Sequence, residues 1–406
     1  MRIKSVFSLF ICLYFPLVVF SQSTIQGRVI SGDDQKPLVF ANVFISNTTK
    51  GQQTDEQGKF KLTQVPSGVI DLIVSYIGYE TFSLQFRADT LKRPLLLVLA
   101  PNAIELEGVA IKRLKNGYEK YFPLFKDYFI GKTNFSKSCK LKNPKALWFM
   151  MSDDQTELII RADELLEIEN KALGFTIKYQ LEEFRYNFRE QYVSFLGYPL
   201  FEEMATNSKK KTETWNENRR KAYYGSSQHF FKSLINQKLT EEGFEMYKLI
   251  REAKKNYFVP AFAEKRDSTG IIIQQASQEK RHIDSTDFKL SNDASLKKVG
   301  THSFAKYVQY LVRTPLKENT VFEEKKGDFY LDFEQHLYIV YNKEFEEPQF
   351  VDGGQTKTPQ ISILTQAEPH ALIEKSGNLT NPLAIIFEGR WSYEKIGELL
   401  PIDYIP

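Results

Sequence analysis

Alternation of apolar and polar side chains, interrupted by glycine and aspartate turns, is the pattern that most restricts how this chain folds. In "LVFANVFIS" every second residue from Val39 to Ile45 is apolar, and "VIDLIVSY" repeats the pattern from Ile70 to Tyr76. Successive side chains of a β-strand point to opposite faces, so such segments bury one face of a sheet. The turn "TDEQGKF" suits a hairpin, because Gly58 can take a positive φ at no steric cost. About seven such strands between residues 24 and 112 predict a β-sandwich.

These residues resemble a known domain family. The segments "GRVISGDDQKPLVFANVFI", "TDEQGKFKL" and "VPSGVIDLIVSYIGYET", with the tail "LEGVAIK", are similar to the carboxypeptidase regulatory-like domain, a transthyretin-like β-sandwich. The resemblance implies a secreted or outer-membrane protein of the Bacteroidetes. In that family the domain also opens receptors that import glycans through TonB-dependent barrels. It accompanies catalysis or transport there and performs neither itself.

The first residues have the composition of a secretory signal peptide. Arg2 and Lys4 form a basic start, an apolar run follows to Phe20, and Ser21 begins a small and polar stretch. The apolar run is too short for a membrane span. We therefore expect a signal peptide over residues 1–21 and a sandwich over 22–112. We also expect secretion across the inner membrane to the periplasm or the outer membrane.

Residues 113–406 are predicted to form a larger β-rich α+β domain. Strand-like runs dominate, and the first five predict an antiparallel meander: "ALWFMMS", "TELIIRAD", "LLEIEN", "GFTIKYQLEEFRYNF" and "EQYVSFLGYPLFEEM". Residues 207–257 are polar with helical spacing and predict a helical insert, and residues 391–400 predict a short amphipathic helix. This half resembles the C-terminal region of Bacteroidetes envelope proteins that begin with the same sandwich. The expected fold class is mainly β with α+β.

Catalytic motifs give little support for an enzyme. A zinc carboxypeptidase needs an H-x-x-E pair, and glutamate follows at that spacing after none of the histidines, which are His229, His282, His302, His336 and His370. The serine-hydrolase motif G-x-S-x-G is absent as well. We therefore predict no catalytic, metal-binding or cofactor-binding residue, and no cofactor.

The best remaining catalytic candidate is "YYGSSQHFFKSL", in which Ser226, Ser227 and His229 stand close together. A serine nucleophile and a histidine base fit this spacing. Serines that cap a helix beside a packed histidine explain the segment equally well. The burial of His229 separates these alternatives, because a base needs an open cleft and a packed ring does not.

The sequence thus predicts a non-enzymatic envelope protein with a binding or scaffolding role. The expected partner is an envelope protein or glycan, and a TonB-dependent receptor is one such protein. A net charge of +3 gives no reason to expect nucleic acid. Two alternatives stay open: a hydrolase of envelope glycan or peptide centred on residues 223–232, and an accessory subunit of a TonB-dependent transporter.

Overall fold

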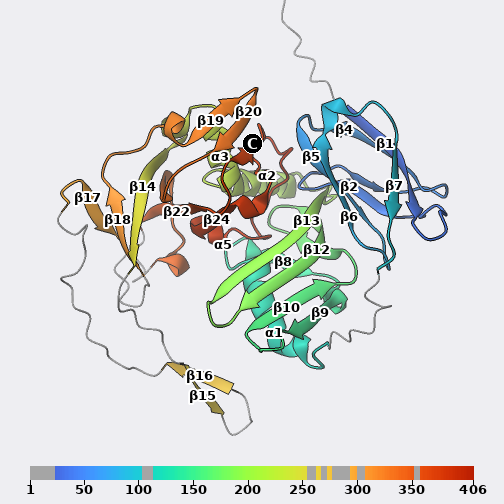
Figure 1. The fold of residues 1–406 in the computed structure, drawn as a ribbon, viewed down its shortest axis with the longest axis horizontal. Helices are drawn as coiled ribbons and strands as arrows, with labels where there is room; N and C mark the ends of the chain where they lie inside the picture. The colour runs from blue at the N-terminus through green and yellow to red at the C-terminus, as the bar shows by residue number, and fades with distance from the viewer. Residues whose placement is uncertain are drawn as a thin grey trace, which may run out of the picture.

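The computed structural model describes residues 23–102, 113–253, 262–266, 272–276, 293–299, 307–351 and 357–406. Its architecture is a set of β-sheets with a few short helices between them (Figure 1). The predicted β-rich α+β class is therefore confirmed. The expected signal peptide and the "LEGVAIK" tail lie outside the described residues. Within the described part of the chain, none of the helices combines the length and the apolar character needed to cross a bilayer.

The N-terminal segment is the predicted sandwich of two sheets. One sheet has the order β4-β1-β7, formed by Lys59–Val65, Ser23–Ser31 and Leu95–Leu99. The other has the order β3-β2-β5-β6, formed by Gly51–Gln53, Asn42–Ile45, Val69–Ser75 and Phe82–Arg87. The inward side chains of both sheets share one core, which includes Ile25, Val43, Phe60, Leu72 and Leu97. This is the packing that the alternating pattern predicts.

A second sheet system follows. Its strands are β8 to β13: Cys139–Leu141, Leu147–Met151, Glu157–Ala162, Leu166–Asn170, Phe175–Asn187 and Tyr192–Glu203. They are antiparallel, but they do not form the simple meander that the sequence predicts. The 13-residue strand β12 pairs with β13 along its length, with β11 at its start and with β10 at its end. Because β12 is long enough for two partners on one edge, β10 and β11 do not pair with each other.

A helix and its continuation cover one face of this second sheet. The helix α1, Gly117–Phe125, runs on into the turn Lys126–Ile130. Phe125, Phe129 and Ile130 enter the same core as the buried side chains of β10 and β12.

The predicted helical insert is correct only for its first part. Helices α2, α3 and α4 span Lys209–Tyr223, Ser227–Ile235 and Leu239–Glu242. Residues Phe244–Ala253 then form strand β14 instead of helix. Phe244 and Met246 are buried in alternation, and β14 pairs with strands on both of its sides. Tertiary pairing therefore ends the insert earlier than the polar composition suggests, and residues 254–257 lie outside the described part.

Strand β14 belongs to a six-stranded sheet with the order β17-β18-β14-β21-β22-β24. Its other strands are Leu296–Val299, Tyr307–Val312, His336–Phe345, Pro359–Gln366 and Ile385–Gly389. A smaller sheet joins β19, β20 and β23, which are Phe322–Lys325, Asp328–Leu331 and Ala371–Ile373. Strands β15 and β16, Phe262–Arg266 and Ile272–Ala276, form a separate hairpin. The predicted C-terminal helix over 391–400 is only one turn, α5 at Arg390–Tyr393. Residues 394–406 form turns and irregular structure.

The turn between β2 and β3 fixes the sandwich to the rest of the chain. The side chains of Phe44 and Ile73 are not part of the sandwich core and pack on Leu200 of β13 instead. The backbone N–H of Asn47 donates to Pro199 O at 2.7 Å, and the N–H of Ile402 donates to Asn47 O at 2.7 Å. One turn therefore holds both β13 and the C-terminal segment.

Replacing Leu200 by alanine tests this contact. Leu200 is buried at the junction, so Leu200→Ala should lower the free energy of unfolding by about 2–4 kcal/mol through lost burial and a cavity. Leu96→Ala is the matched control, because Leu96 is 63% exposed on β7, and it should change the value by less than about 0.5 kcal/mol. Urea unfolding followed by fluorescence measures both. Equal losses in the two variants would contradict the docked arrangement.

Candidate functional site

The side chain of Arg390 is the centre of the most unusual charge arrangement in the described chain. It follows β24 directly and is only 6% exposed. Gly389 turns the chain inward with φ +71°, and a Cβ there would lie 2.4 Å from Ile361 O. Only glycine fits this position, so the turn that buries the guanidinium is specified locally.

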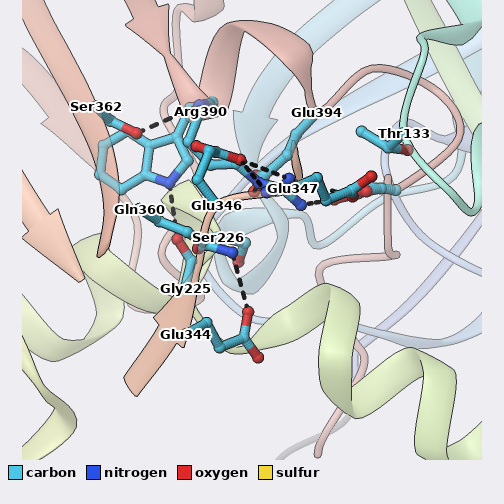
Figure 2. Close-up of polar contacts among 12 residues, drawn as sticks. Thr133, Gly225, Ser226, Glu344, Glu346, Glu347, Gln360, Ser362, Arg390 and Glu394 are labelled. Carbon is cyan, nitrogen blue, oxygen red and sulfur yellow. Dashed lines mark hydrogen bonds and ion pairs between the residues drawn. The ribbon is translucent and has the colours of Figure 1, made fainter. Parts of the chain in front are cut away.

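Four carboxylates surround this guanidinium (Figure 2). Arg390 Nε donates to Glu394 Oε1 at 3.1 Å, and Nη2 donates to Glu398 Oε2 at 2.9 Å. Nη1 donates to Glu346 Oε1 at 3.2 Å and to Glu347 Oε1 at 3.3 Å. Glu346 and Glu347 follow β21, whereas the other two belong to the C-terminal segment, so the cluster joins two distant parts of the chain.

One guanidinium cannot neutralise four carboxylates whose side chains are only 4% to 17% exposed. Burial raises the pKa of Glu394 to about 8, against the opposing effect of Arg390. Burial also raises the pKa of Glu398, which accepts a hydrogen bond from Thr133. Burial by itself lowers the pKa of Arg390, but the surrounding carboxylates outweigh it and raise that pKa. The cluster therefore holds a proton on a carboxyl group near neutral pH.

A cavity of about 180 Å³ adjoins this cluster. Glu394 and Glu398 line one side, and Ser226 and Ser227 line it from the start of α3. Asn47 of the sandwich reaches the same space, together with apolar side chains such as Phe231 and Phe387. The space fits a few waters or a small polar molecule. Among the residues that the structure describes, no group of histidine, cysteine and acidic side chains has the arrangement of a metal site.

The candidate catalytic residues occupy separate environments. His229 is 3% exposed, its Nδ1 accepts from the backbone N–H of Gly225 at 3.1 Å, and its Nε2 lies 3.2 Å from Glu242 Oε2. Aromatic rings enclose it, and burial lowers its pKa. Ser226 caps α3: its Oγ accepts from the backbone N–H of His229 at 3.2 Å and donates to Tyr223 O at 2.7 Å. The structure therefore brings Ser226 and Ser227 to the cavity but forms no serine–imidazole hydrogen bond.

Sequence reasoning did not find the Arg390 cluster. Glu394 and Glu398 follow Arg390 at intervals of four residues, which is a detectable signal in "GRWSYEKIGE". Glu346 and Glu347 carry no such signal, because only the pairing of β21 with β22 and of β22 with β24 brings them to Arg390. Of the other histidines, His282 and His302 lie outside the described residues.

Residues 25–111 match the family model of the CarboxypepD_reg-like domain, which agrees with the resemblance noted in the sequence. A TonB-dependent receptor of Formosa agariphila is 41% identical to this chain over 61 residues. That match covers 15% of this chain and only 6% of the receptor. The chain therefore contains a carboxypeptidase regulatory-like domain, and its match to the receptor spans only a small share of the receptor's length.

Solved structures show only weak likeness to the chain. A cohesin–X-dockerin complex from Acetivibrio cellulolyticus is 19% identical with a TM-score of 0.19, and it covers 21% of this chain and 63% of its own. The major pilin subunit of Bacillus cereus is 7% identical with a TM-score of 0.16, over 94% of this chain and 85% of its own. Scores this low support no shared fold.

The raised pKa of Glu394 predicts a pH-dependent stability. The folded protein binds this proton more tightly than the unfolded chain, so the contribution is complete below the ordinary glutamate pKa of 4.5 and is lost as pH rises to about 8. Glu394→Gln should flatten the stability profile across this window, by up to about 1.4 kcal/mol per pH unit. Denaturant midpoints measured from pH 5 to 8 test it, with the exposed Glu119→Gln as control. Parallel profiles for native and Glu394→Gln protein would refute the assignment.

Removal of the central cation should cause a large loss in the free energy of unfolding. Arg390→Met leaves four carboxyl groups without their common donor, and breaking a buried ion pair in this way costs about 3–5 kcal/mol. Arg113→Met removes an exposed pair with Asp163 and should cost less than about 1 kcal/mol. Thermal unfolding of both variants at one pH makes the comparison. A loss at Arg390 no larger than that at Arg113 would show that the cluster contributes no net stability.

Proposed function

We propose that this chain is a secreted, non-catalytic binding or scaffolding protein of the cell envelope. In this proposal residues 22–112 are a docking module, and residues 113–406 form the larger partner-binding part. The observation that carries it is the attachment of the sandwich through Asn47, which contacts β13 and the C-terminal segment at once. A module fixed in this way presents its surface at a constant angle to the rest of the chain, which suits recognition of a partner.

The matched receptor segment supports a partner of the TonB-dependent class. The family model places the CarboxypepD_reg-like domain at residues 25–111, the part of the chain that the proposal assigns to docking. Because the match spans only a small share of the receptor, transport itself is not transferred to this chain. An accessory subunit of such a transporter is the form of the proposal that uses this similarity best.

The hydrolase alternative centred on residues 223–232 has weaker support. Both ring nitrogens of His229 have other partners, and the hydroxyl of Ser226 donates to a backbone carbonyl. Serine activation requires a base within hydrogen-bond reach of the hydroxyl. The contacts of Ser226 and His229 are those of a capped helix end.

Capture from the native envelope tests the proposal. The tagged full-length protein, cross-linked in cells before extraction, should enrich a TonB-dependent receptor at least tenfold over a secreted control protein with the same tag. Purified protein should release no product from peptidoglycan or envelope peptides. Ser226→Ala should lower stability by about 1 kcal/mol through the lost helix cap, whereas Ser227→Ala should not. Product release that Ser226→Ala abolishes would replace the binding role by the hydrolase.

A further inference from the structure

A second cavity, of about 390 Å³, lies between the sandwich and the sheet formed by β8 to β13. The sandwich contributes the chain around residues 39–42 and 75–77, and the opposite wall comes from residues 143, 163–167 and 178. We call this space the junction cleft. Its volume lies in the range of specific binding sites. The site described above contributes none of its lining residues.

Phe40 stands at this cleft in a conformation that the fold enforces. Phe40 is 64% exposed, and its backbone has φ +60°, which is uncommon for a bulky side chain. The buried Thr54 locks the turn: its Oγ1 donates to Leu38 O at 2.6 Å and accepts from Ala41 N–H at 2.9 Å. The N–H of Phe40 also donates to Thr54 O at 3.1 Å. This conformation costs about 1–3 kcal/mol of backbone strain and keeps a phenyl ring in contact with water.

Ile77 is a second apolar side chain at the same cleft. It is 71% exposed at the tip of a turn that is closed by the hydrogen bond from Tyr79 N–H to Tyr76 O at 3.1 Å. Gly78 supplies the φ of +83° that this turn needs. The rings of Tyr76 and Tyr79 lie 5.5 Å apart and support the turn. Two turns closed by hydrogen bonds therefore place large exposed apolar side chains along the lining of one cavity.

The opposite wall of the junction cleft is negatively charged. Asp163, Glu164 and Glu167 are exposed there, and Lys178 is the cation among the lining residues. Lys178 already pairs with Glu202 at 2.8 Å, and Asp163 accepts from Arg113 at 3.0 Å. Among the described residues no ion pair involves Glu164 or Glu167, although Glu164 Oε1 accepts from Asn143 Nδ2 at 3.1 Å and Glu167 is opposite Lys178 in the sheet. With Asp163, the three carboxylates outnumber the one lysine of the lining, so the wall carries an excess of negative charge.

Polar side chains on neighbouring strands complete the lining. Asn42 of β2 is opposite Gln53 of β3 and Ser75 of β5, so the three form a row across the sheet. Gln53 Nε2 donates to Asn42 Oδ1 at 3.3 Å, and the buried Ser75 Oγ donates to Gln180 Oε1 at 2.6 Å. The Asn42 amide N–H groups and the Gln53 amide oxygen are the groups of this row that a polypeptide backbone can bond. Apolar, acidic and amide groups therefore surround the same space.

We propose that the junction cleft binds an extended segment of a partner protein in which a lysine or arginine stands beside an apolar side chain. The inference rests on the proposed binding function and names the chemistry of its partner. The apolar residue packs between Phe40 and Ile77, and the cation meets Glu164 and Glu167. Phe40 also offers a flat face on which a sugar ring stacks, so binding of a glycan is an outcome that the test below distinguishes.

Synthetic peptides and the full-length protein test this inference. The probes are fluorescein-labelled nine-residue peptides that alternate lysine or arginine with leucine or phenylalanine, and matched peptides with glutamate for each cation or serine for each apolar residue. Fluorescence anisotropy should show binding of the first set at least tenfold tighter than binding of either matched set. The difference from the glutamate set should shrink with added salt, because the charges are exposed.

The decisive variant is Phe40→Asn. Asparagine tolerates the positive φ, so this variant should keep or raise the thermal midpoint while it weakens peptide binding at least tenfold. Glu164→Gln combined with Glu167→Gln should weaken binding and remove most of its salt dependence. Leu96→Asn and Glu119→Gln, at exposed positions away from the cleft, should leave binding unchanged. Because the thermal midpoint of Phe40→Asn is not lowered, its loss of binding cannot be attributed to unfolding.

Three outcomes overturn the inference. The first is absence of peptide binding, and the second is binding that survives Phe40→Asn. The third is binding of envelope glycans instead of peptides, with loss in Phe40→Asn. Failure of the proposed function looks different. If native protein and Phe40→Asn capture the same envelope partner, the binding role stands and the junction cleft is not its site; if native protein captures none, the binding role itself fails.

Discussion

The burial of Arg390 is the interaction on which the joining of the sheets depends. A guanidinium removed from water is stable only where anionic partners offset its lost hydration, and four glutamates supply these partners. The residues that follow Arg390 in the chain are thereby placed to form further contacts. Trp391 Nε1 donates to Gly225 O at 2.7 Å, and Gly397 N–H donates to Ile130 O at 2.9 Å. The C-terminal segment thereby contacts the chain before α3 and the segment after α1. It also contacts β11, because Asn170 Nδ2 donates to Gly397 O at 2.8 Å, and the sandwich through Ile402.

The sequence predicts those parts of the fold whose contacts are local. Alternation specifies the sandwich core, because each strand carries its own buried face. Phe44 shows what alternation missed: it lies between Val43 and Ile45, and all three are buried. A continuous apolar triplet indicates a strand covered on both faces. That triplet was the available signal that a second body packs on the outside of the sandwich.

The candidate site was predictable only in its local half. The serines before α3 follow capping rules, so their positions can be read from "GSSQ". The glutamates opposite Arg390 cannot, because they come from positions 43 and 44 residues away. Strand β14 is a similar case: its polar composition favours helix, and pairing with β18 and β21 overrides it. Both the Arg390 cluster and strand β14 depend on contacts with residues far away in the sequence, and local sequence patterns do not predict such contacts.

The junction cleft extends this dependence from stability to recognition. Its apolar side belongs to the sandwich, whereas Glu164 and Glu167 belong to the following sheet, so neither part alone has the whole lining. Contacts of Asn47 and Leu200 hold the two sides at a fixed separation. On our proposal, the strain at Phe40 is useful only beside Glu164 and Glu167, so the contacts that fix the sandwich also create the specificity of the cleft.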